Sequence, residues 1–184
     1  MFKQTVAVLA LFAVAPVYAD DIDCTGSIGA TTVDGNVIVP SNQSCTLTGT
    51  YVKGNVELED GAKLLARGST YIEGSVQTDG ADRVRIRDSE VNGDVQLTGV
   101  DGSISSFVLS SVIGGTVEWE DNSAAFLIRF SDVNGDVKVN QNSAQARVFD
   151  NVVDGNLQCQ ANEPAPVGAR NVVGGNKEDQ CAGF

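Results

Sequence analysis

The sequence is dominated by a repeat of about twenty residues built around a glycine. The glycine is followed by Asn, Asp, Ser or Thr, and an apolar residue lies two positions before it. Another apolar residue lies two positions after it in every repeat except the last. The repeat glycines, which recur at nearly constant intervals, are Gly35, Gly54, Gly74, Gly93, Gly115, Gly135, Gly155 and Gly175. Such regularity predicts a repeat architecture over residues 35–175.

The apolar residues of each repeat have the period of a β-strand, in which successive side chains point to opposite faces. A second alternating segment lies midway through most repeats, as in Val84-Arg85-Ile86. We interpret the glycine and its polar follower as a bend, because these residues tolerate tight or left-handed backbone. Short strands joined by corners predict an all-β fold, a single-stranded parallel β-helix of about eight coils.

A polar residue precedes each repeat glycine by four positions. These residues are Thr31, Thr50, Thr70, Ser89, Ser111, Ser131, Asn151 and Asn171. By alternation they share the inward face with the apolar residue two positions later, so we expect them to be satisfied by hydrogen bonds at a corner. A threonine array for binding ice or sugar is the alternative, but the mixture of residue types favours a structural role.

Residues 1–19 have the pattern of a secretory signal peptide, with Lys3, an apolar run from Val6 to Val14 and a small residue at Ala19. We expect cleavage before Asp20, which leaves residues 20–184 as a single solenoid domain. The apolar run is shorter than the ~20 residues that span a bilayer, so no transmembrane segment is expected. The expected location is the bacterial periplasm, the cell surface or the extracellular space.

Four cysteines lie near the ends of the predicted solenoid. Cys24 and Cys45 are separated by about one repeat in the sequence, and so are Cys159 and Cys181. Residues one coil apart lie on adjacent strands, within the Cα separation that a disulfide tolerates. The spacing therefore predicts the bridges Cys24–Cys45 and Cys159–Cys181. A metal or redox site is the alternative, although the chain has no Cys-x-x-Cys and no His.

Composition narrows the classes of function. The chain has 24 acids against 12 bases, a net charge of −12, which disfavours nucleic acid and anionic membrane as partners of the whole surface. The absence of His removes the commonest general base and metal ligand. No interval between repeat glycines has room for the long loops that wall the clefts of solenoid polysaccharide lyases and hydrolases. We expect a non-catalytic protein without a cofactor.

The bases are concentrated in one part of the repeat. Eight of the eleven that follow residue 19 fall in or beside the middle strand segment: Lys63, Arg67, Arg83, Arg85, Arg87, Arg129, Arg147 and Arg170. Arg83, Arg85 and Arg87 alternate with apolar residues and should point outward from one strand, with Lys63 and Arg67 on the coil before. We interpret these five residues as a basic stripe suited to sulfate, phosphate or uronate groups. The alternative is a solvated face, partly neutralised by nearby aspartates.

Tyr51 and Tyr71 occupy one outward position on neighbouring coils and are candidate sugar-binding residues. Stacking of the two rings on each other explains them equally well. Val112, Val152 and Val172 continue this column and suggest a modest apolar strip.

Charged residues stand at both ends of the predicted rod. Lys177 and Asp179 replace apolar residues in the last repeat, and Asp20, Asp21 and Asp23 precede the first coil. Charges on exposed strand edges oppose pairing with another chain. We therefore expect end-to-end stacking to be disfavoured.

The Gly-Asn-Val-x-Val repeat, with a final run from Gly174 to Cys181, resembles small exported parallel β-helix proteins of bacteria. This resemblance implies a right-handed helix and an exported location, but no activity. The repeat from Gly35 to Gly175 is also similar to bactofilins, the polymer-forming β-helix scaffolds of bacteria. This chain departs from the cytoplasmic bactofilins in its signal peptide, its predicted disulfides and its charged ends, which disfavour filaments.

The sequence thus favours a binding or structural module of the cell envelope that contacts an anionic polysaccharide or envelope component through the basic stripe. A self-associating envelope scaffold is the alternative, and a carbohydrate-active β-helix enzyme is the third hypothesis.

Overall fold

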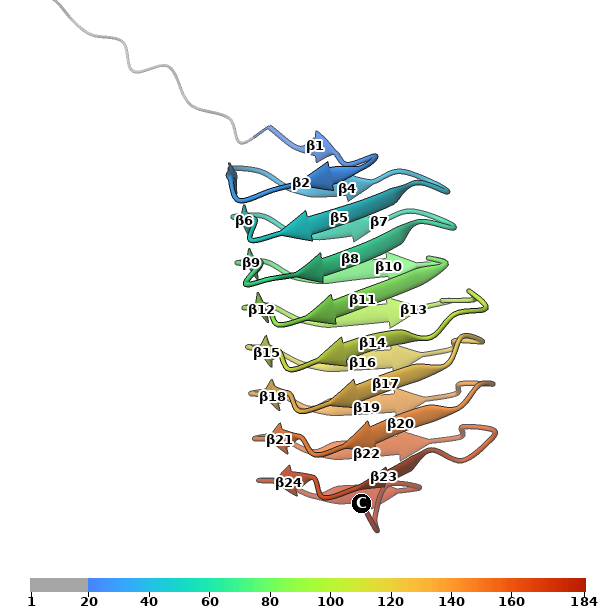
Figure 1. Cartoon of the computed structure of the whole chain (residues 1–184). Helices are drawn as coiled ribbons and strands as arrows, with labels where there is room; N and C mark the ends of the chain where they lie inside the picture. Colours follow the sequence, from blue (N-terminus) through green and yellow to red (C-terminus); the bar gives the residue numbers. More distant parts are fainter. Residues whose placement is uncertain (1–19) are drawn as a thin grey trace, which may run out of the picture.

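Residues 20–184 form a β-solenoid in the computed structural model of the protein (Figure 1). The described residues contain no helix, so none of them could cross a membrane in helical form. About eight coils of ~20 residues are stacked along one axis, and their core lies entirely within this range. The predicted all-β parallel solenoid is confirmed, whereas the predicted signal peptide, residues 1–19, lies outside the described residues.

Each complete coil contributes one strand to each of three parallel sheets, which we call A, B and C. Sheet A consists of β1 (Ile22–Asp23), β4 (Val37–Val39), β7 (Val56–Leu58), β10 (Val76–Asp79), β13 (Val95–Thr98), β16 (Val117–Glu120), β19 (Val137–Asn140), β22 (Leu157–Gln160) and β25 (Lys177–Asp179). Sheet B consists of β2 (Ser27–Ile28), β5 (Ser44–Thr48), β8 (Lys63–Arg67), β11 (Arg83–Arg87), β14 (Ser106–Leu109), β17 (Phe126–Arg129), β20 (Ala146–Phe149) and β23 (Val167–Ala169). Sheet C consists of β3 (Thr32–Val33), β6 (Tyr51–Val52), β9 (Tyr71–Ile72), β12 (Glu90–Val91), β15 (Val112–Ile113), β18 (Asp132–Val133), β21 (Val152–Val153) and β24 (Val172–Val173).

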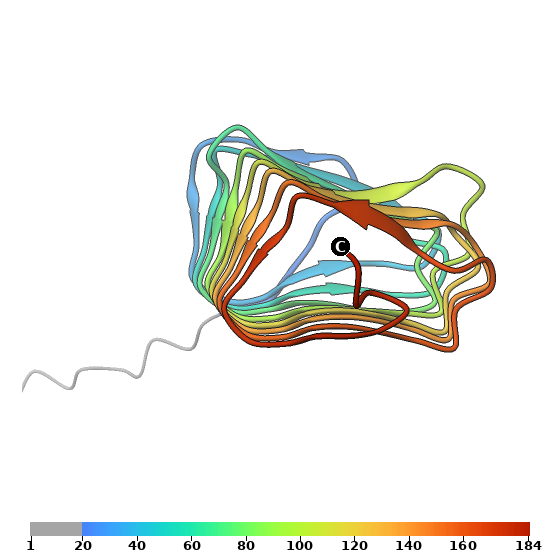
Figure 2. The same ribbon diagram turned by 90° about the horizontal axis from the view of Figure 1, so that it is seen from below.

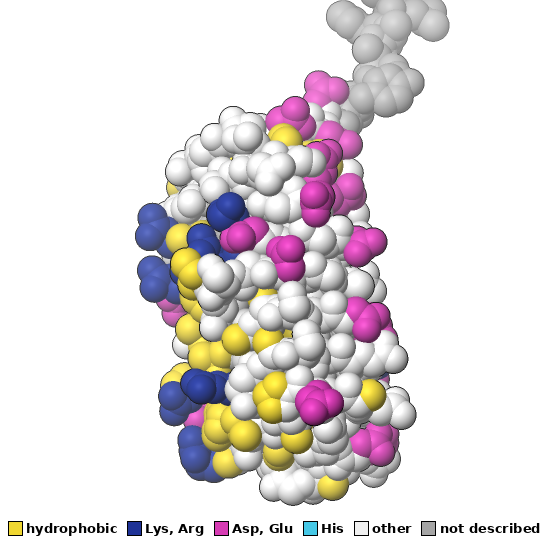
Figure 3. Space-filling view, turned by 90° about the vertical axis from the view of Figure 1, so that its right-hand side faces the viewer, with side chains coloured by type: hydrophobic (Ala, Val, Ile, Leu, Met, Phe, Trp, Pro, Cys, Tyr) yellow, Lys and Arg dark blue, Asp and Glu magenta, His cyan; other side chains and the backbone are white. Residues whose placement is uncertain are grey.

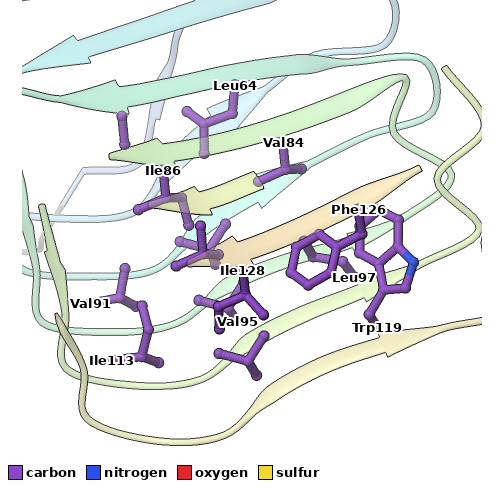
Figure 4. Packing of buried hydrophobic residues seen from close by; sticks show 14 of the residues in the cluster. Leu64, Val84, Ile86, Val91, Val95, Leu97, Ile113, Trp119, Phe126 and Ile128 are labelled. Carbon is purple, nitrogen blue, oxygen red and sulfur yellow. The ribbon is translucent and has the colours of Figure 1, made fainter. Parts of the chain in front are cut away.

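The core is a set of columns in which each buried side chain packs on its counterpart one coil away. In sheet A, Val76 is paired in register with Val56 and Val95, and all three are buried. Viewed along the axis, the sheets enclose one interior (Figure 2). Trp119 and Phe126 are buried in it as a stacked pair with ring centroids 4.5 Å apart (Figure 4). Burial of this apolar surface is the main force that holds the coils together.

The repeat glycines are required by the close approach of successive coils. A Cβ atom on Gly135 would lie 2.6 Å from the carbonyl oxygen of Gly115, and Gly155 meets Gly135 in the same way. Within residues 20–184 the glycines with left-handed backbone are Gly49, Gly61, Gly68, Gly80 and Gly99, none of which is a repeat glycine. The predicted bend at the repeat glycine is confirmed, but its backbone is not left-handed, and the limited space between coils is what requires glycine at this position.

The polar residue after each repeat glycine forms a ladder of hydrogen bonds along the solenoid. Its side-chain oxygen accepts a bond from the backbone N–H of the equivalent residue on the next coil, as Asn55 does from Ser75 at 2.9 Å. The chain of acceptors runs through Asp21, Asn36, Asn55, Ser75, Asp94, Thr116, Asp136 and Asn156. These side chains also occupy the space beside the repeat glycine of the next coil. A Cβ atom added to Gly155, for example, would lie 2.3 Å from the Asp136 carboxylate.

We predict that Gly135→Ala lowers the free energy of unfolding by about 2 kcal/mol, the typical cost of overfilling a packed site. The added methyl group would collide with the backbone of the coil before it. Gly26→Ala is the matched control, because nothing lies within 4 Å of the position of its Cβ. Urea denaturation measures both, and equal stability of the two variants would contradict a steric role for the repeat glycine.

The predicted polar column at the corner between sheets B and C is structural, as expected. Its members from Thr50 to Asn171 are buried, whereas Thr31 in the first coil is exposed. The Asn151 amide, for example, donates to Asn171 Oδ1 at 3.0 Å and to the carbonyl of Ile128 at 3.1 Å. A second buried amide column at the opposite corner was not predicted, and it consists of Asn122, Asn142 and Asn162.

Both predicted disulfides are confirmed by the structure. Cys24 is bonded to Cys45 with a Cα–Cα distance of 5.4 Å, and Cys159 to Cys181 with 5.3 Å. The second bridge joins Cys181, in the turn after β25, to Cys159 in β22 of the preceding coil. Phe184 packs against the core at this end of the solenoid.

Lys177 closes the C-terminal end of the solenoid. It stands at an inward position, next to Leu157 of the previous coil, and its ammonium group donates to the carbonyls of Asn171 and Phe184. This half-buried amine therefore acts as a cap on the carbonyls. The charges at the N-terminal end remain on the surface, since Asp20, Asp21 and Asp23 are all exposed.

We predict that Cys159→Ala/Cys181→Ala destabilises the protein by about 3 kcal/mol, because the unfolded chain regains the freedom of a loop of about one coil. Urea denaturation of this variant measures the loss. The unaltered protein in reducing agent serves as a comparison, and a double variant as stable as the unaltered protein would contradict the expected contribution.

Candidate anion-binding face

The structure brings the five residues of the basic stripe together on the outer face of sheet B. Arg83, Arg85 and Arg87 alternate along β11 with the buried residues Val84 and Ile86. On the preceding strand, Lys63 is paired in register with Arg83, and Arg67 follows Ala66, the partner of Ile86. The predicted placement of the stripe on two adjacent coils is therefore correct.

Much of the positive charge in the stripe has no neutralising partner. In the described part of the chain, carboxylates form ion pairs with four of the bases, and of the stripe only Lys63 is among them, 3.7 Å from Asp82. Burial of the Arg85 guanidinium and, to a smaller extent, the charge of Arg83 lower the pKa of Arg85. The stripe is thus a concentration of cationic groups that repel one another.

Farther along sheet B, Asp150 neutralises two arginines. Arg129 donates to its carboxylate at 2.9 Å from one side, and Arg170 donates at 2.8 Å from the next coil. The bond from Arg170 above all, with that from Arg129, holds the pKa of Asp150 below its ordinary value. Neutralisation by aspartate, which the solvated-face alternative expects, is thus seen at this pair of arginines and, within the stripe, at Lys63.

Apolar side chains share the outer face of sheet B with the arginines, and the sequence analysis missed them. Arg85 is paired in register with Leu65 on one side and Phe107 on the other, and its guanidinium lies 5.2 Å from the Phe107 ring centroid. Leu127 follows Phe107 in the same column, and Leu109 pairs with Arg87. The signal was present in the alternation of these strands, but only the register between coils shows that the residues are contiguous.

The acidic residues are gathered elsewhere on the molecule. The outward side chains of sheet A include Glu57, Glu118, Glu120 and Glu178, with Lys138 as a base among them. Figure 3 shows the Lys and Arg side chains gathered with hydrophobic ones along one edge, where a few carboxylates adjoin them, and most of the other carboxylates in that view toward the opposite side. The solenoid therefore has an acidic face on sheet A and a basic, partly apolar face on sheet B.

The two candidate tyrosines lie on sheet C and do not join the basic stripe. Tyr51 and Tyr71 are paired in register, with ring centroids 5.4 Å apart and planes at 67°. The rings therefore meet edge to face instead of stacking. The Tyr51 hydroxyl donates to the Glu73 carboxylate, and this bond raises the pKa of Tyr51.

The predicted apolar strip of sheet C is interrupted. Val112 and Val152 belong to one outward column, but Asp132 lies between them. Val172 continues the column beyond Val152.

Shallow depressions lie on the outer surfaces of sheets A and B. One of about 470 Å³ lies on sheet A and is lined by Glu57, Gln77, Asp79, Gln96 and Glu118. Two of about 150 and 190 Å³ lie on sheet B. Among residues 20–184, no three His, Cys, Asp or Glu side chains converge in a way that could hold a metal ion.

Comparison with known protein families, with curated proteins and with solved structures finds no match for this chain. The argument for function therefore depends on the surfaces described above.

We predict that Asp150→Asn lowers the thermal unfolding midpoint at pH 7. A carboxylate whose pKa is lowered in the folded state stabilises that state above its unfolded pKa and loses this effect as the pH falls. The difference from the unaltered protein should therefore shrink below pH 3.8, the ordinary value for this group. Asp132→Asn, which removes an exposed carboxylate from sheet C, is the control. If the midpoint of Asp150→Asn stayed below that of the unaltered protein by the same amount in acid, the electrostatic explanation would be wrong.

Proposed function

We propose that the protein is an exported, non-catalytic binding module of the cell envelope that docks through sheet B on a component with anionic groups. The observation that carries the proposal is the separation of charge on an acidic protein. Of the eleven bases in residues 20–184, seven lie on sheet B and an eighth, Arg170, directly follows its last strand. A local cationic surface of this kind attracts anions even when the whole molecule is negative.

The geometry of the stripe suits repeated phosphate, sulfate or carboxylate groups. Side chains two residues apart on a strand project about 7 Å from each other, and neighbouring strands are about 4.8 Å apart. Arg83, Arg85 and Arg87 thus present three guanidinium groups in a row, each able to form two parallel hydrogen bonds to an oxyanion. The sequence analysis expects an anionic polysaccharide among such partners.

The basic stripe also places like charges close together, which destabilises the folded protein. Lys63 lies directly beside Arg83 on the adjacent strand, where like charges destabilise a sheet, and the Asp82 carboxylate 3.7 Å from Lys63 offsets part of this repulsion. An oxyanion bound between them would relieve the repulsion. This cost to the free protein supports a role of the stripe in binding.

The separated charges also favour a second candidate function, a laterally self-associating scaffold. The acidic face of one copy is complementary in charge to the basic face of another. Native mass spectrometry of residues 20–184 distinguishes the two functions, since a monomer supports the binding module and a concentration-dependent series of oligomers supports the scaffold.

We predict that Arg83→Gln/Arg85→Gln/Arg87→Gln weakens binding to an anionic probe by about tenfold or more, as the loss of charge-assisted hydrogen bonds implies. The salt dependence of binding should also become shallower. Dextran sulfate, polygalacturonate and phosphatidylglycerol vesicles are the probes, with residues 20–184 as the protein and calorimetry as the measurement.

Lys53→Gln/Lys138→Gln is the control, because it removes positive charge outside sheet B. It should leave the affinity unchanged. If the triple variant binds every probe as well as the unaltered protein does, sheet B is not the docking face and the proposed function is wrong.

A further inference from the structure

The outer face of sheet B continues from the basic stripe into an apolar patch. The patch consists of Phe107, Leu109, Leu127, Phe130 and Phe149, with Ile104 exposed in the segment just before β14. Phe107 and Leu127 are paired in register, as are Phe149 and Arg129 on the adjacent column. Apolar and cationic groups therefore lie in one surface, side by side.

Phe130 is a bulky apolar residue at a corner where the fold requires left-handed backbone. The residue directly after each of the last seven strands of sheet B has left-handed backbone, and these residues are Gly49, Gly68, Asp88, Ser110, Phe130, Asp150 and Arg170. A bulky apolar residue is rarely found in this conformation. Phe130 nevertheless adopts it, at φ 54°, and leaves its side chain 57% exposed under the guanidinium of Arg129. Backbone strain without a gain in burial points to a function of the side chain.

Ile104, just outside the patch, is the second exposed apolar residue. It lies in the segment before β14, within the longest of the repeats, between Gly93 and Gly115, and is 53% exposed. Figure 2 shows this segment, in yellow-green, projecting beyond the corresponding corners of the other coils on the side of sheet B. Ile104 precedes β14 and Phe130 follows β17, so the two residues lie at opposite ends of these adjacent parallel strands. Both side chains are exposed and can insert into a deformable partner.

The side chains on the outer face of sheet B favour one class of anionic partner over another. From β5 to β23, the outward positions of sheet B hold no Asp, Glu, Asn or Gln. A polysaccharide presents hydroxyl groups that both donate and accept, whereas arginine only donates, so on this face the acceptors for such donors are the hydroxyls of Ser44, Thr46 and Thr48 on β5. A lipid layer presents anionic headgroups beside hydrocarbon, which matches a surface of arginines, leucines and phenylalanines.

The shape of the face agrees with a planar partner. The strands from β5 to β23 form a surface of about 30 by 15 Å, without a deep cleft. The carboxylates of sheet A lie on the other side of the core, more than about 10 Å away. That distance exceeds a Debye length of about 8 Å at physiological salt, so their repulsion from an anionic layer is screened, whereas Asp82, Asp88 and Asp150 lie beside the strands of sheet B and offset part of its attraction.

We infer, on the basis of the proposed docking function, that the partner of sheet B is a lipid layer with anionic headgroups. The basic stripe contacts the headgroup phosphates, and Phe130 of the apolar patch enters the boundary with the acyl chains together with Ile104.

The test compares Phe130→Asn with the unaltered protein, both as residues 20–184, in sedimentation with vesicles. Asparagine tolerates left-handed backbone, so the thermal midpoint should stay the same or rise. Binding to vesicles of phosphatidylcholine with phosphatidylglycerol should fall about tenfold, and binding to dextran sulfate should not change. Pure phosphatidylcholine should bind neither protein. Val172→Asn, which replaces an exposed apolar residue on sheet C, is the matched control and should bind as the unaltered protein does.

The outcomes separate this inference from the proposed function. If Phe130→Asn keeps full affinity for the vesicles, or if polygalacturonate binds while the vesicles do not, the lipid partner is wrong and the docking function stands. If the three-arginine variant binds all anionic probes normally, the docking function itself fails.

A second variant tests insertion directly. Ile104→Trp should show tryptophan emission that shifts to shorter wavelength with anionic vesicles and is quenched by lipids brominated in the acyl chain. The native Trp119 is fully buried and provides the baseline. Emission that does not respond to the vesicles would overturn insertion of this segment.

Discussion

The whole molecule depends on one constraint: every position of a coil must pack on its own counterpart one coil away. The repeat glycines satisfy it by lacking the Cβ that would meet the backbone of the previous coil. The polar residues after them satisfy it with side-chain oxygens that accept the next coil's N–H groups. Inside, valine packs on valine, and at two corners asparagine amides bond to one another. Stacking at strand-to-strand distance allows no side chain that conflicts with its own copy.

Outward-facing positions are less restricted by this packing, and the residues at these positions differ from coil to coil. Sheet A displays carboxylates and amides, whereas sheet B displays arginines, leucines and phenylalanines. The resulting faces are two-dimensional arrays whose rows are strands and whose columns are set by the register. A surface of this kind suits an extended partner, because its binding groups are spread over several coils and are not enclosed in a pocket. Strain at Phe130 and repulsion between Lys63 and Arg83 are the places where this surface departs from what stability alone favours.

Features with the period of the coil were predictable from the sequence. The solenoid, the inward columns, both disulfides and the grouping of Arg83, Arg85 and Arg87 follow from spacing, since residues one period apart become neighbours. The bend at the repeat glycine was predicted, but the close contact between coils was not, because a bend and a close contact select the same residue. The apolar patch was missed because Phe107 and Arg85 are separated by the longest repeat and meet only through the register of β11 and β14. Lys177 was expected to display its charge, but the carbonyls of Asn171, before β24, and of Phe184, after β25, bind it.

The sequence by itself determined the period, and with it the class of fold, the number of coils and the cysteine pairs. It did so because a solenoid converts a separation of one coil into direct contact between strands. Only the tertiary structure decided which outward residues share a face. The coils differ slightly in length, and the corners absorb the difference, so the register of each strand is set by packing along the whole stack. That register places the tyrosines on sheet C, the carboxylates on sheet A, and the arginines with the apolar patch on sheet B.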